Sequence, residues 1–368
     1  MKRIATLTTH AALNYGAVLQ AYALQQYIRD QGCACEVLNY VPTYISKYYA
    51  LIQRPTTIRS LLLSLYQARH SDARAQRQAQ FERFRQTYLH LSGPVLSTHD
   101  DLVHTANGYD LILCGSDQIW NPAIHGFDEG FFLSFPDFHA EKVSYAASFG
   151  QDMIEEAIKP ELRRRLTGFS AFSCREHSAC LLLRELTGQD PTMVLDPVFL
   201  LTPRHWRSMK QPIYAPKTYA LAYFLSDPGQ SPFALKRYAK QHGAAVFSIG
   251  FSPRDVRYGI TCDYSLGPCQ FLSAVDGASV ILTNSFHCAA FAILFEKNFF
   301  IRISRGKSSR NDRLVSLLED LGLQDRMYYD EDIGTLALDK PIDYGPVKRL
   351  LLDHISKSKA FLQQFLTE

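Results

Sequence analysis

An asparagine, a serine and a histidine follow one apolar run of the chain closely enough to form a site. The run covers residues 279–282, and Asn284, Ser285 and His287 come directly after it. We expect the run to be a buried parallel strand and residues 289–295 to belong to a packed helix that Ser285 caps. His287 then lies in the first helical turn, where free N–H groups and the helix dipole favour an anionic ligand. An imidazole beside a bound anion predicts proton transfer. The alternative is a histidine that only caps the turn between the strand and the helix.

Five further polar segments each follow an apolar run that resembles a strand. They cover residues 14–16, 115–118, 148–150, 175–176 and 196–197. In open parallel sheets, ligands bind outside the carboxyl ends of the strands, so these segments are expected along one edge. Any one of them could be ordinary turn chemistry, because Gly, Asn, Asp and Ser fill loops for backbone reasons. Six such segments at one predicted edge indicate an active site between two domains.

Arg175 is the most informative charged residue among these segments. It ends an apolar run, and a guanidinium in such a place needs an anionic partner or the solvent. Glu176 or Asp196 could be that partner, and so could the phosphate or carboxylate of a ligand.

Structural roles compete with chemical roles at other positions. Asp117 could cap a helix, and Trp120 and Tyr145 could be core aromatic residues. Asp196 could simply form a turn with Pro197. The local sequence leaves each of these alternatives open.

Two basic segments have a similar ambiguity. Residues 71–85 contain four arginines on a predicted helix, and a solvated face is the default interpretation, with an anionic acceptor or a membrane surface as the alternative. The loop at 302–310 contains Arg305 and Lys307 and follows a strand. It could supply cations to the anion beside His287.

Strands and helices alternate along the whole chain, which is typical of parallel sheets covered by helices. The expected strands are at residues 4–7, 36–40, 111–114, 143–147, 171–174, 193–195, 219–224, 245–249, 279–282 and 299–303. A proline-marked connection at 203–216 is the best candidate boundary. We therefore predict two doubly wound α/β domains that face a cleft, at 1–205 and 206–344. A helix in 345–368 caps the sheet or returns to the first domain.

Composition limits the class of protein. The 368 residues carry a net charge of +3, which gives no case for nucleic-acid binding, and 46% are hydrophobic. The eight cysteines form no C-x-x-C pair and show no metal-ligand spacing, so we expect reduced thiols and a cytoplasmic protein. The amino terminus lacks the apolar segment of a signal peptide, and no stretch is long enough to span a bilayer.

Several of these segments together resemble the polysaccharide pyruvyl transferase family. The matching segments are residues 14–22 (NYGAVLQAY), 115–122 (GSDQIWNP), 144–150 (SYAASFG), 174–176 (CRE), 195–197 (LDP) and 283–287 (TNSFH). They occur in the family's order, and the resemblance runs from about residue 1 to 326. One departure is Cys288, where relatives usually carry a glycine.

The resemblance implies a two-domain fold like that of GT-B glycosyltransferases. It also implies transfer of the pyruvyl group of phosphoenolpyruvate to two hydroxyls of one sugar, with release of phosphate and formation of a cyclic ketal. The acceptor would belong to a bacterial surface polysaccharide, such as an exopolysaccharide or capsule, or to a precursor. No step requires a metal or a further cofactor.

The resemblance also assigns roles on the donor side. His287 is the implied general acid or base, and Arg175 and Lys307 are implied to bind the donor, with Arg305 as a rival of Lys307. Asn284 and Ser285 complete the predicted donor site. We expect His287 to be protonated mainly when donor is bound, because a full phosphate charge outweighs the half charge of a helix dipole.

The acceptor side is assigned from the first domain. Asp117 or Asp196 could deprotonate the acceptor hydroxyl, and Trp120 or Tyr145 could stack on the sugar. The predicted acceptor-binding residues are Asn14, Tyr15, Gln118, Trp120 and Tyr145.

Two other classes of function remain open. A nucleotide-sugar glycosyltransferase would place a diphosphate at the helix that follows residues 279–282, and a non-catalytic homologue would only bind glycan. A lipid-linked acceptor would bring a cytoplasmic enzyme to the inner face of the membrane, with residues 71–85 as the contact. No nucleic-acid partner is expected.

Overall fold

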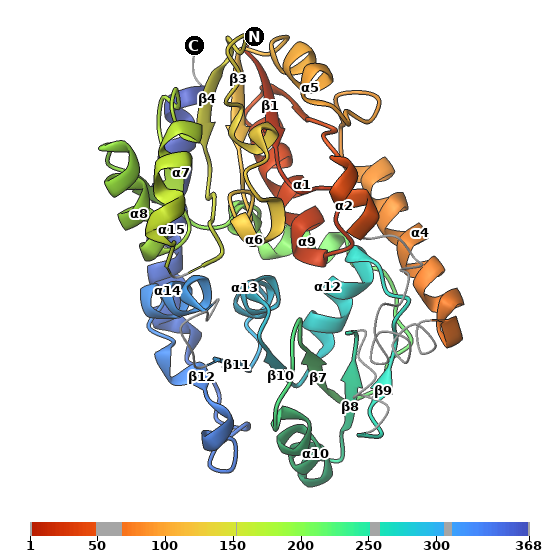
Figure 1. Ribbon diagram of the computed structural model, residues 1–368. Coiled ribbons are helices and arrows are strands. Elements are labelled where there is room, and N and C mark those ends of the chain that lie inside the picture. The colour runs from red at the N-terminus through yellow and green to blue at the C-terminus, as the bar shows by residue number, and fades with distance from the viewer. Residues whose placement is uncertain (1, 49–67, 152, 251–257, 305–310, 367–368) are drawn as a thin grey trace.

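The computed structural model describes residues 2–48, 68–151, 153–250, 258–304 and 311–366. It is an α/β fold with two separate main sheets, which lie above and below one another in Figure 1. All strand pairs in the described ranges are parallel. The prediction of parallel-sheet α/β architecture is therefore confirmed.

The first sheet has the strand order β2-β1-β3-β4, and a small sheet of β5 and β6 continues it. Isolated parallel bridges from Val143 to Ala171 and from Ala147 to Cys174 place β5 beside the end of β4. The strand β3 is buried along its whole length, as expected for an apolar run covered on both faces. The bounds are β1 (Arg3–Leu7), β2 (Ala34–Val37), β3 (Leu111–Cys114), β4 (Glu141–Ser144), β5 (Ser173–Cys174) and β6 (Thr192–Met193).

Helices of the first half pack around this sheet. The long helix α1 begins after Asn14, whose side chain accepts hydrogen bonds from the N–H groups of Gly16 and Ala17. The helices are α1 (Tyr15–Asp30), α2 (Thr43–Tyr48), α4 (Ser71–Tyr88), α5 (His99–Ala106), α6 (Pro122–His125), α7 (Lys159–Arg165) and α8 (His177–Thr187), with short 3-10 helices η1 (Glu129–Phe132), η2 (Glu156–Ile158) and η3 (Pro197–Leu200).

The second sheet has the order β12-β11-β10-β7-β8-β9, with β10 at its centre. Its strands are β7 (Tyr219–Tyr223), β8 (Ala245–Ser248), β9 (Thr261–Cys262), β10 (Val280–Thr283), β11 (Phe299–Arg302) and β12 (Met327–Tyr328). The remaining helices are α9 (Pro203–Ser208), α10 (Ser231–His242), α12 (Pro268–Gly277), α13 (Phe286–Leu294), α14 (Asp312–Asp320) and α15 (Tyr344–Leu366), with 3-10 helices η4 (Gln324–Arg326) and η5 (Asp330–Asp332).

The two halves share one hydrophobic core. Helix α1 of the first half faces α12 and α13 of the second, between the two sheets (Figure 1). Tyr15 is fully buried there: its ring stacks on Phe271 at 4.6 Å, and its hydroxyl donates to the carbonyl of Leu266 (2.9 Å). The apolar contact holds the carboxyl ends of the two sheets toward each other.

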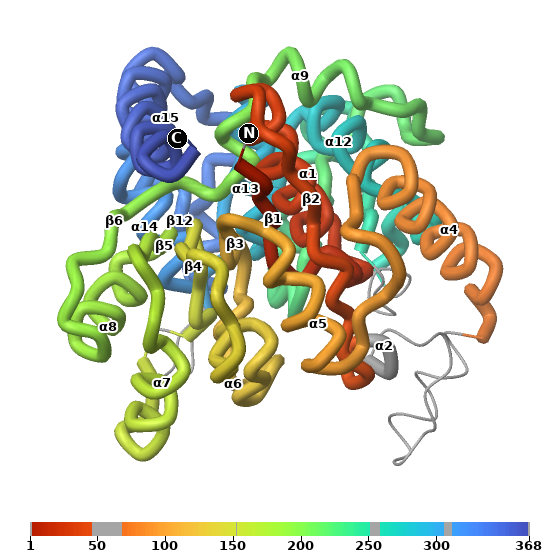
Figure 2. Tube along the Cα trace, turned by 90° about the horizontal axis from the view of Figure 1, so that it is seen from above, coloured from red at the N-terminus to blue at the C-terminus, as the bar shows by residue number. Residues whose placement is uncertain are grey.

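Helix α15 packs against the first half of the chain. Ser358 Oγ accepts a hydrogen bond from the N–H of Leu195 (2.8 Å), and Lys2 Nζ donates to the carbonyl of Phe365 (3.0 Å). The end of α15 consequently lies beside the start of β1 (Figure 2). The domain limits at 205/206 and 344/345 stay predictions, and α9 lies inside the predicted linker.

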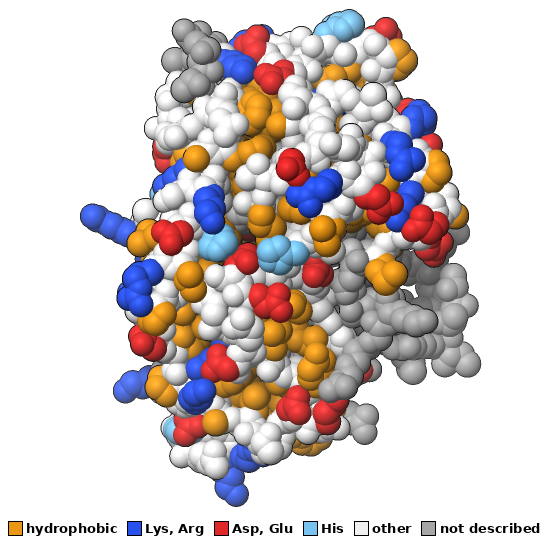
Figure 3. Space-filling view, turned by 90° about the vertical axis from the view of Figure 1, so that its left-hand side faces the viewer, with side chains coloured by type: hydrophobic (Ala, Val, Ile, Leu, Met, Phe, Trp, Pro, Cys, Tyr) orange, Lys and Arg blue, Asp and Glu red, His pale blue; other side chains and the backbone are white. Residues whose placement is uncertain are grey.

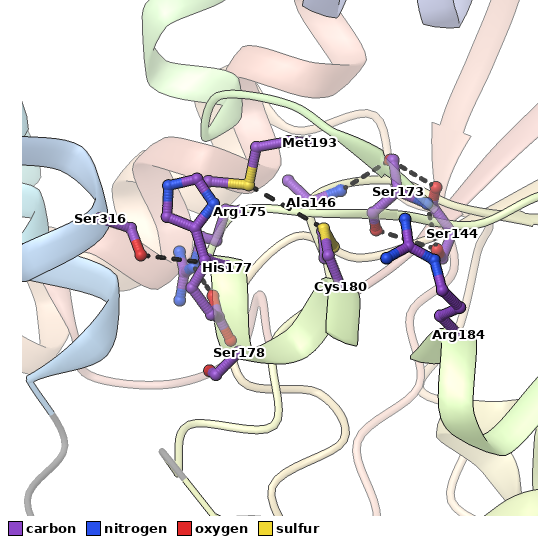
Figure 4. Close-up of a disulfide and its surroundings, with 12 residues drawn as sticks. Ser144, Ala146, Ser173, Arg175, His177, Ser178, Cys180, Arg184, Met193 and Ser316 are labelled. Atoms are coloured by element: carbon purple, nitrogen blue, oxygen red, sulfur yellow. Dashed lines mark hydrogen bonds and ion pairs between the residues drawn. A yellow bond between two sulfur atoms is a disulfide. The ribbon is translucent and has the colours of Figure 1, made fainter. Parts of the chain in front are cut away.

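The structure corrects the expectation that all thiols are reduced. Cys174 and Cys180 form a disulfide, with their Cα atoms 6.0 Å apart (Figure 4). Cys174 ends β5, and α8 begins three residues later, so the first turns of α8 bring Cys180 back over the strand end. The six-residue spacing resembles neither a redox motif nor a metal site, and the sequence therefore gave no signal for the pair.

Candidate active site

His287 lies where the sequence predicts it. It is in the first turn of α13, directly after the buried strand β10, and Ser285 Oγ caps the helix by accepting from the N–H of Cys288 (3.4 Å). The residue is buried, with 6% of its surface exposed. The predicted strand, N-cap and helix are thus confirmed for this motif.

The first turn of α1 meets the His287 ring from the other half of the chain. A Cβ atom on Gly16 would lie 1.9 Å from His287 Nδ1, so no side chain fits at this position. The glycine of the Asn14-Tyr15-Gly16 segment is therefore needed for close approach. The amino ends of α1 and α13 come together at one point between the sheets.

Three further predicted residues join His287 in a buried network. Arg175 donates from Nη1 to Asp196 Oδ2 (2.6 Å) and from Nη2 to Asp117 Oδ1 (2.8 Å). Asp196 Oδ2 lies 3.3 Å from His287 Nε2 and also accepts from Ser116 Oγ (3.2 Å). The Arg175 guanidinium stacks over the Phe286 ring at 4.7 Å. Of the partners that the sequence left open for Arg175, Asp196 is bonded to it and Glu176 Oε2 lies 3.8 Å from its Nε, while Asp117 is a partner that the sequence did not suggest.

The charges of this network hold the aspartates ionised. Burial raises the pKa of Asp117, but the Arg175 guanidinium, with further contributions from its other neighbours, outweighs burial and keeps this pKa below its ordinary value. Burial likewise opposes ionisation of Asp196, and His287 and Arg175 again prevail, so its pKa is strongly lowered. Asp117 is consequently a weak base while Arg175 holds it.

Glu176 behaves in the opposite way. Burial raises the pKa of Glu176 to about 7, although Arg175 and a hydrogen bond with Ser148 oppose the shift. Its Oε2 atom has no hydrogen-bond partner among the described residues. Glu176 is thus a buried acid that titrates near neutral pH, directly beside the network.

A cavity of about 510 Å³ opens beside Asp117 on the first half of the chain. Its walls come from the loop after β1, from α2 and from the loop and short helix α6 after β3. The lining residues are Thr9, Ala12, Asn14, Ala17, Tyr44, Ile45, Asp117, Gln118, Ala123, Ile124 and His125. Of the predicted acceptor-binding residues, Asn14 and Gln118 line this cavity.

The other three predicted acceptor residues are core aromatics, and the structure corrects their assignment. Tyr15 belongs to the contact between the two halves, and Trp120 is buried among phenylalanine rings with its indole N–H donated to the carbonyl of Phe131 (3.1 Å). Tyr145 is fully buried and donates to the carbonyl of Leu195 (3.1 Å). None of these three rings has a face free for a sugar.

On the donor side, Asn284 turns away from the network. Its Oδ1 accepts from the N–H of Leu225 (2.8 Å) and its Nδ2 donates to Ser226 Oγ (2.6 Å), which fixes the loop after β7. Arg305 and Lys307 lie outside the described residues. Arg302, before them, pairs with Asp330 (2.5 Å).

Arg313 is a further residue of the site, and no local sequence pattern predicts it. It lies in the first turn of α14, and Gln118 accepts from its Nη1 and Nη2 (3.0 and 3.1 Å) when the Gln118 amide oxygen is turned toward it. Beside this contact, Ser178 Oγ donates to Asp312 Oδ2 (2.5 Å) and the N–H of His177 donates to Ser316 Oγ (3.2 Å; Figure 4). Only the fold, which brings α14 to the first half, reveals these pairs.

The basic helix α4 turns two of its arginines inward. Arg77 lies over the Tyr15 ring at 4.5 Å, and Arg85 donates to the carbonyl of Ala11 (3.3 Å) and to Glu82.

Acidic and basic side chains are interspersed on the face shown in Figure 3. None of the helices in the described ranges combines the length and apolar character that a membrane span requires.

Two facing parallel α/β sheets with a site between them define a GT-B-like protein, and solved structures share this fold. The UDP-GlcNAc 2-epimerase from Neisseria meningitidis bound to UDP-GlcNAc is 11% identical, with a TM-score of 0.55 over 100% of both chains. Another UDP-N-acetylglucosamine 2-epimerase is 12% identical, with a TM-score of 0.57 over 100% of this chain and 95% of that one. The Methanocaldococcus jannaschii UDP-GlcNAc 2-epimerase is 11% identical, with a TM-score of 0.52 over 96% and 99%. These identities establish the fold alone.

The family is established by sequence. The family model described as polysaccharide pyruvyl transferase matches residues 14–304, which is most of the chain. The chain belongs to the polysaccharide pyruvyl transferase family. It is therefore a transferase, and the family implies a polysaccharide or sugar acceptor. A comparison with curated proteins found no match.

Proposed function

We propose that the protein transfers the pyruvyl group of phosphoenolpyruvate to two hydroxyls of one sugar in a bacterial surface polysaccharide or its precursor. The observation that supports this most directly is the convergence of family segments from both halves of the chain. Asp117, Arg175 and Asp196 come from the first half and His287 from the second, and all four lie in one buried network.

The reaction balances without a further reactant. One sugar hydroxyl adds to the central carbon of phosphoenolpyruvate, and the methylene carbon of phosphoenolpyruvate takes a proton. A second hydroxyl of the same sugar then displaces phosphate from that carbon and closes the ketal. The two hydroxyls lose two protons in total. One of them balances the proton that converts the methylene group into a methyl group, and the other leaves on the phosphate. The protein has to supply a general acid, anion-binding groups and a positioned acceptor.

We assign the general acid to His287. Its ring is fixed by contact with Gly16 on one side and by the Asp196 carboxylate, 3.3 Å from Nε2, on the other. Asp196 has no exposed side-chain surface and is bonded to Arg175 and Ser116, so its role in this scheme is to orient the imidazole rather than to meet substrate.

The donor binds at the amino end of α13, with Lys307 or Arg305, which follow β11 in the sequence, as cationic partner. Arg175 takes part in donor binding by exchanging the carboxylate of an aspartate for the carboxylate of the donor. Its Asp117 partner is the more exposed of the two aspartates, at 14% against 0% for Asp196. A donor carboxylate that replaces Asp117 on Arg175 would release Asp117 toward the cavity. There it becomes a better base for the acceptor hydroxyl, because the pairing that lowers its pKa is lost.

The first experiment is thermal unfolding with phosphoenolpyruvate and, separately, with a panel of UDP-sugars. A ligand that binds the folded state raises the midpoint. We expect phosphoenolpyruvate alone to raise it, and Lys307→Ala to reduce the effect, while Lys217→Ala, at an exposed lysine, keeps it. Stabilisation by a UDP-sugar and not by phosphoenolpyruvate would replace this function with that of a glycosyltransferase.

The chemical role of His287 is tested by turnover. His287→Gln is expected to lower kcat about 10²–10⁴-fold while the midpoint shift with phosphoenolpyruvate persists, because general acid catalysis contributes on this scale. Phosphate release in the presence of acceptor sugars, with the pyruvylated product identified by mass spectrometry, measures the effect. Full activity of the variant would remove His287 from the mechanism.

A further inference from the structure

Three hydrogen-bonded side chains, those of Tyr44, Asp128 and His125, lie beside the 510 Å³ cavity, and two of them line it. Tyr44 of α2 donates to Asp128 Oδ2 (2.9 Å), and the same hydroxyl lies 3.0 Å from Nδ1 of His125, the last residue of α6. Tyr44 and His125 both line the cavity that also contains Asp117. No local sequence pattern points to any of these three residues.

The hydrogen bonds among Tyr44, Asp128 and His125 determine which ring nitrogen of His125 carries the proton. A tyrosine hydroxyl has one proton, and a carboxylate can only accept, so the Tyr44 proton belongs to the bond with Asp128. Asp128 also accepts from Tyr40 (2.9 Å) and from His99 Nε2 (3.0 Å). The Tyr44 oxygen must then accept from His125, which places the imidazole proton on Nδ1. The other ring nitrogen, Nε2, is left with its lone pair.

His125 lines the cavity beside Asp117 and also a second hollow beside His99 and Asp128. The His125 side chain has no other hydrogen bond within the described residues, and its Nε2 is not among the described polar atoms that are sealed from solvent without a partner. The opposite side of the residue is held by the Phe131 ring, 4.6 Å between centroids. The imidazole is thus held by the Tyr44 hydroxyl and by the Phe131 ring, while its Nε2 has no partner among the described residues.

The surroundings decide between a base and a hydrogen-bond acceptor. Burial lowers the pKa of His125 to about 4, although Asp128 and Asp117 oppose the shift. A ring with so low a pKa stays neutral at physiological pH and is a poor base, but its nitrogen accepts hydrogen bonds well. Sugar hydroxyls are the donors that an acceptor substrate brings to this cavity.

We propose that His125 Nε2 accepts a hydrogen bond from a hydroxyl of the acceptor sugar and so recognises the sugar at that position. The inference rests on the proposed function and deepens it, because it adds a specificity-determining residue to the acceptor site. Tyr44 and Asp128 are positioning residues, which present the correct nitrogen to the cavity. A sugar without a hydroxyl at this position leaves Nε2 unpaired and binds less well.

The tautomer is measured on the protein alone. Long-range ¹H–¹⁵N NMR spectra at pH 7, with His125→Gln to assign the ring signals, are expected to show His125 protonated at Nδ1 and unprotonated at Nε2. Tyr44→Phe removes the fixing hydroxyl and is expected to yield a mixture of tautomers. A ring protonated at Nε2, or at both nitrogens, would overturn the proposal whatever the acceptor is.

Kinetics then test the contact with substrate. Methyl glycosides of glucose, galactose, mannose, N-acetylglucosamine and N-acetylmannosamine serve as probes for phosphate release from phosphoenolpyruvate. For the best of them, His125→Leu is expected to raise the acceptor KM at least tenfold with little change in the KM for phosphoenolpyruvate. His125→Gln, whose amide oxygen can occupy the place of Nε2, is expected to recover part of the loss.

The outcomes separate this inference from the function on which it rests. An acceptor KM that is the same in wild type, His125→Leu and His125→Gln overturns the role of His125 and leaves pyruvyl transfer intact. Absence of both the midpoint shift and phosphate release with phosphoenolpyruvate overturns the proposed function instead. Monodeoxy versions of the best glycoside identify the hydroxyl: the one recognised by His125 matters in wild type and no longer in His125→Leu.

Discussion

At the scale of single residues, the site depends on a glycine that lets two helices meet. A Cβ on Gly16 would lie 1.9 Å from His287 Nδ1, so the imidazole could not keep its place beside Asp196. We expect Gly16→Ala to lower the free energy of unfolding by about 1–3 kcal/mol and to reduce turnover strongly. Urea unfolding and phosphate release measure the two effects. Gly334→Ala is the control, because a Cβ there meets nothing within 4 Å; if both variants behaved alike, the contact would be unimportant.

Glu176 makes stability depend on pH at the same scale. Its pKa in the folded protein is about 7 because of burial, against 4.5 for an ordinary glutamate. Between these values the folded protein binds a proton that the unfolded chain has released, so the free energy of unfolding decreases as pH rises from about 4.5 to 7. Glu176→Gln is expected to remove on the order of 1–3 kcal/mol of this decrease and to exceed wild type in stability at pH 8. Urea unfolding at pH 5 and pH 8 measures the free energy of unfolding of wild type and of Glu176→Gln. If this free energy changed with pH equally in both proteins, Glu176 would not be the group responsible.

Single residues differ in how far the sequence can predict them. The position of His287 depends on Ser285 and on the apolar runs directly before and after it, so local patterns suffice. Whether Trp120 or Tyr145 reaches a sugar depends on which distant elements cover it, and no local pattern contains that information. Both rings were predicted as ligand-binding and are core residues.

At the scale of elements, a disulfide fastens α8 to β5 directly beside Arg175. Cys174 and Cys180 close a short loop, six residues apart in sequence, and α8 carries the contacts of His177 and Ser178 with α14. In the chain-entropy account, a loop of this length contributes about 2 kcal/mol. We expect dithiothreitol to lower the free energy of unfolding of wild type by roughly this amount.

The matched control for reduction is the double variant Cys174→Ala, Cys180→Ala. It lacks the bond and keeps the other six cysteines, so dithiothreitol should leave its urea midpoint unchanged. A wild type that is equally stable with and without reductant would show that the bond does not stabilise α8. If dithiothreitol destabilised the double variant as much as wild type, the change in stability would come from other thiols.

Elements that lie within a long apolar segment of the sequence could be predicted, and short isolated ones could not. The strand expected at 279–282 is β10, shifted by one residue, and its helix α13 is present. The strands β5 and β6 pair over only two residues each, so their predicted lengths were too long. The helix α6, which carries His125, has four residues, and one helical turn shows no periodicity.

At the scale of the whole molecule, the two sheets are joined by a core rather than by surface contacts. Residues of α1, α12 and α13 belong to one buried apolar cluster, and α15 returns to the first half. The alternation of strands and helices predicts two sheets facing a site, because that pattern is repeated on both sides of the linker. It does not predict how tightly the halves pack, since this depends on which aromatic side chains meet across them.

Tight packing between the halves predicts that the molecule unfolds as one unit. Tyr15 joins the halves through Phe271 and Leu266, and its replacement leaves a cavity at their contact. We expect wild type to show a single calorimetric transition and Tyr15→Ala to lose about 3–5 kcal/mol and to unfold in two steps, because the halves are uncoupled. Tyr15→Phe keeps the ring and loses one hydrogen bond, so it should cost only about 1 kcal/mol and retain a single transition. Tyr214→Ala, at a side chain that is 96% exposed, should match wild type. Two transitions in wild type would show that each half is stable alone and that the contact between them, with the site it encloses, opens without global unfolding.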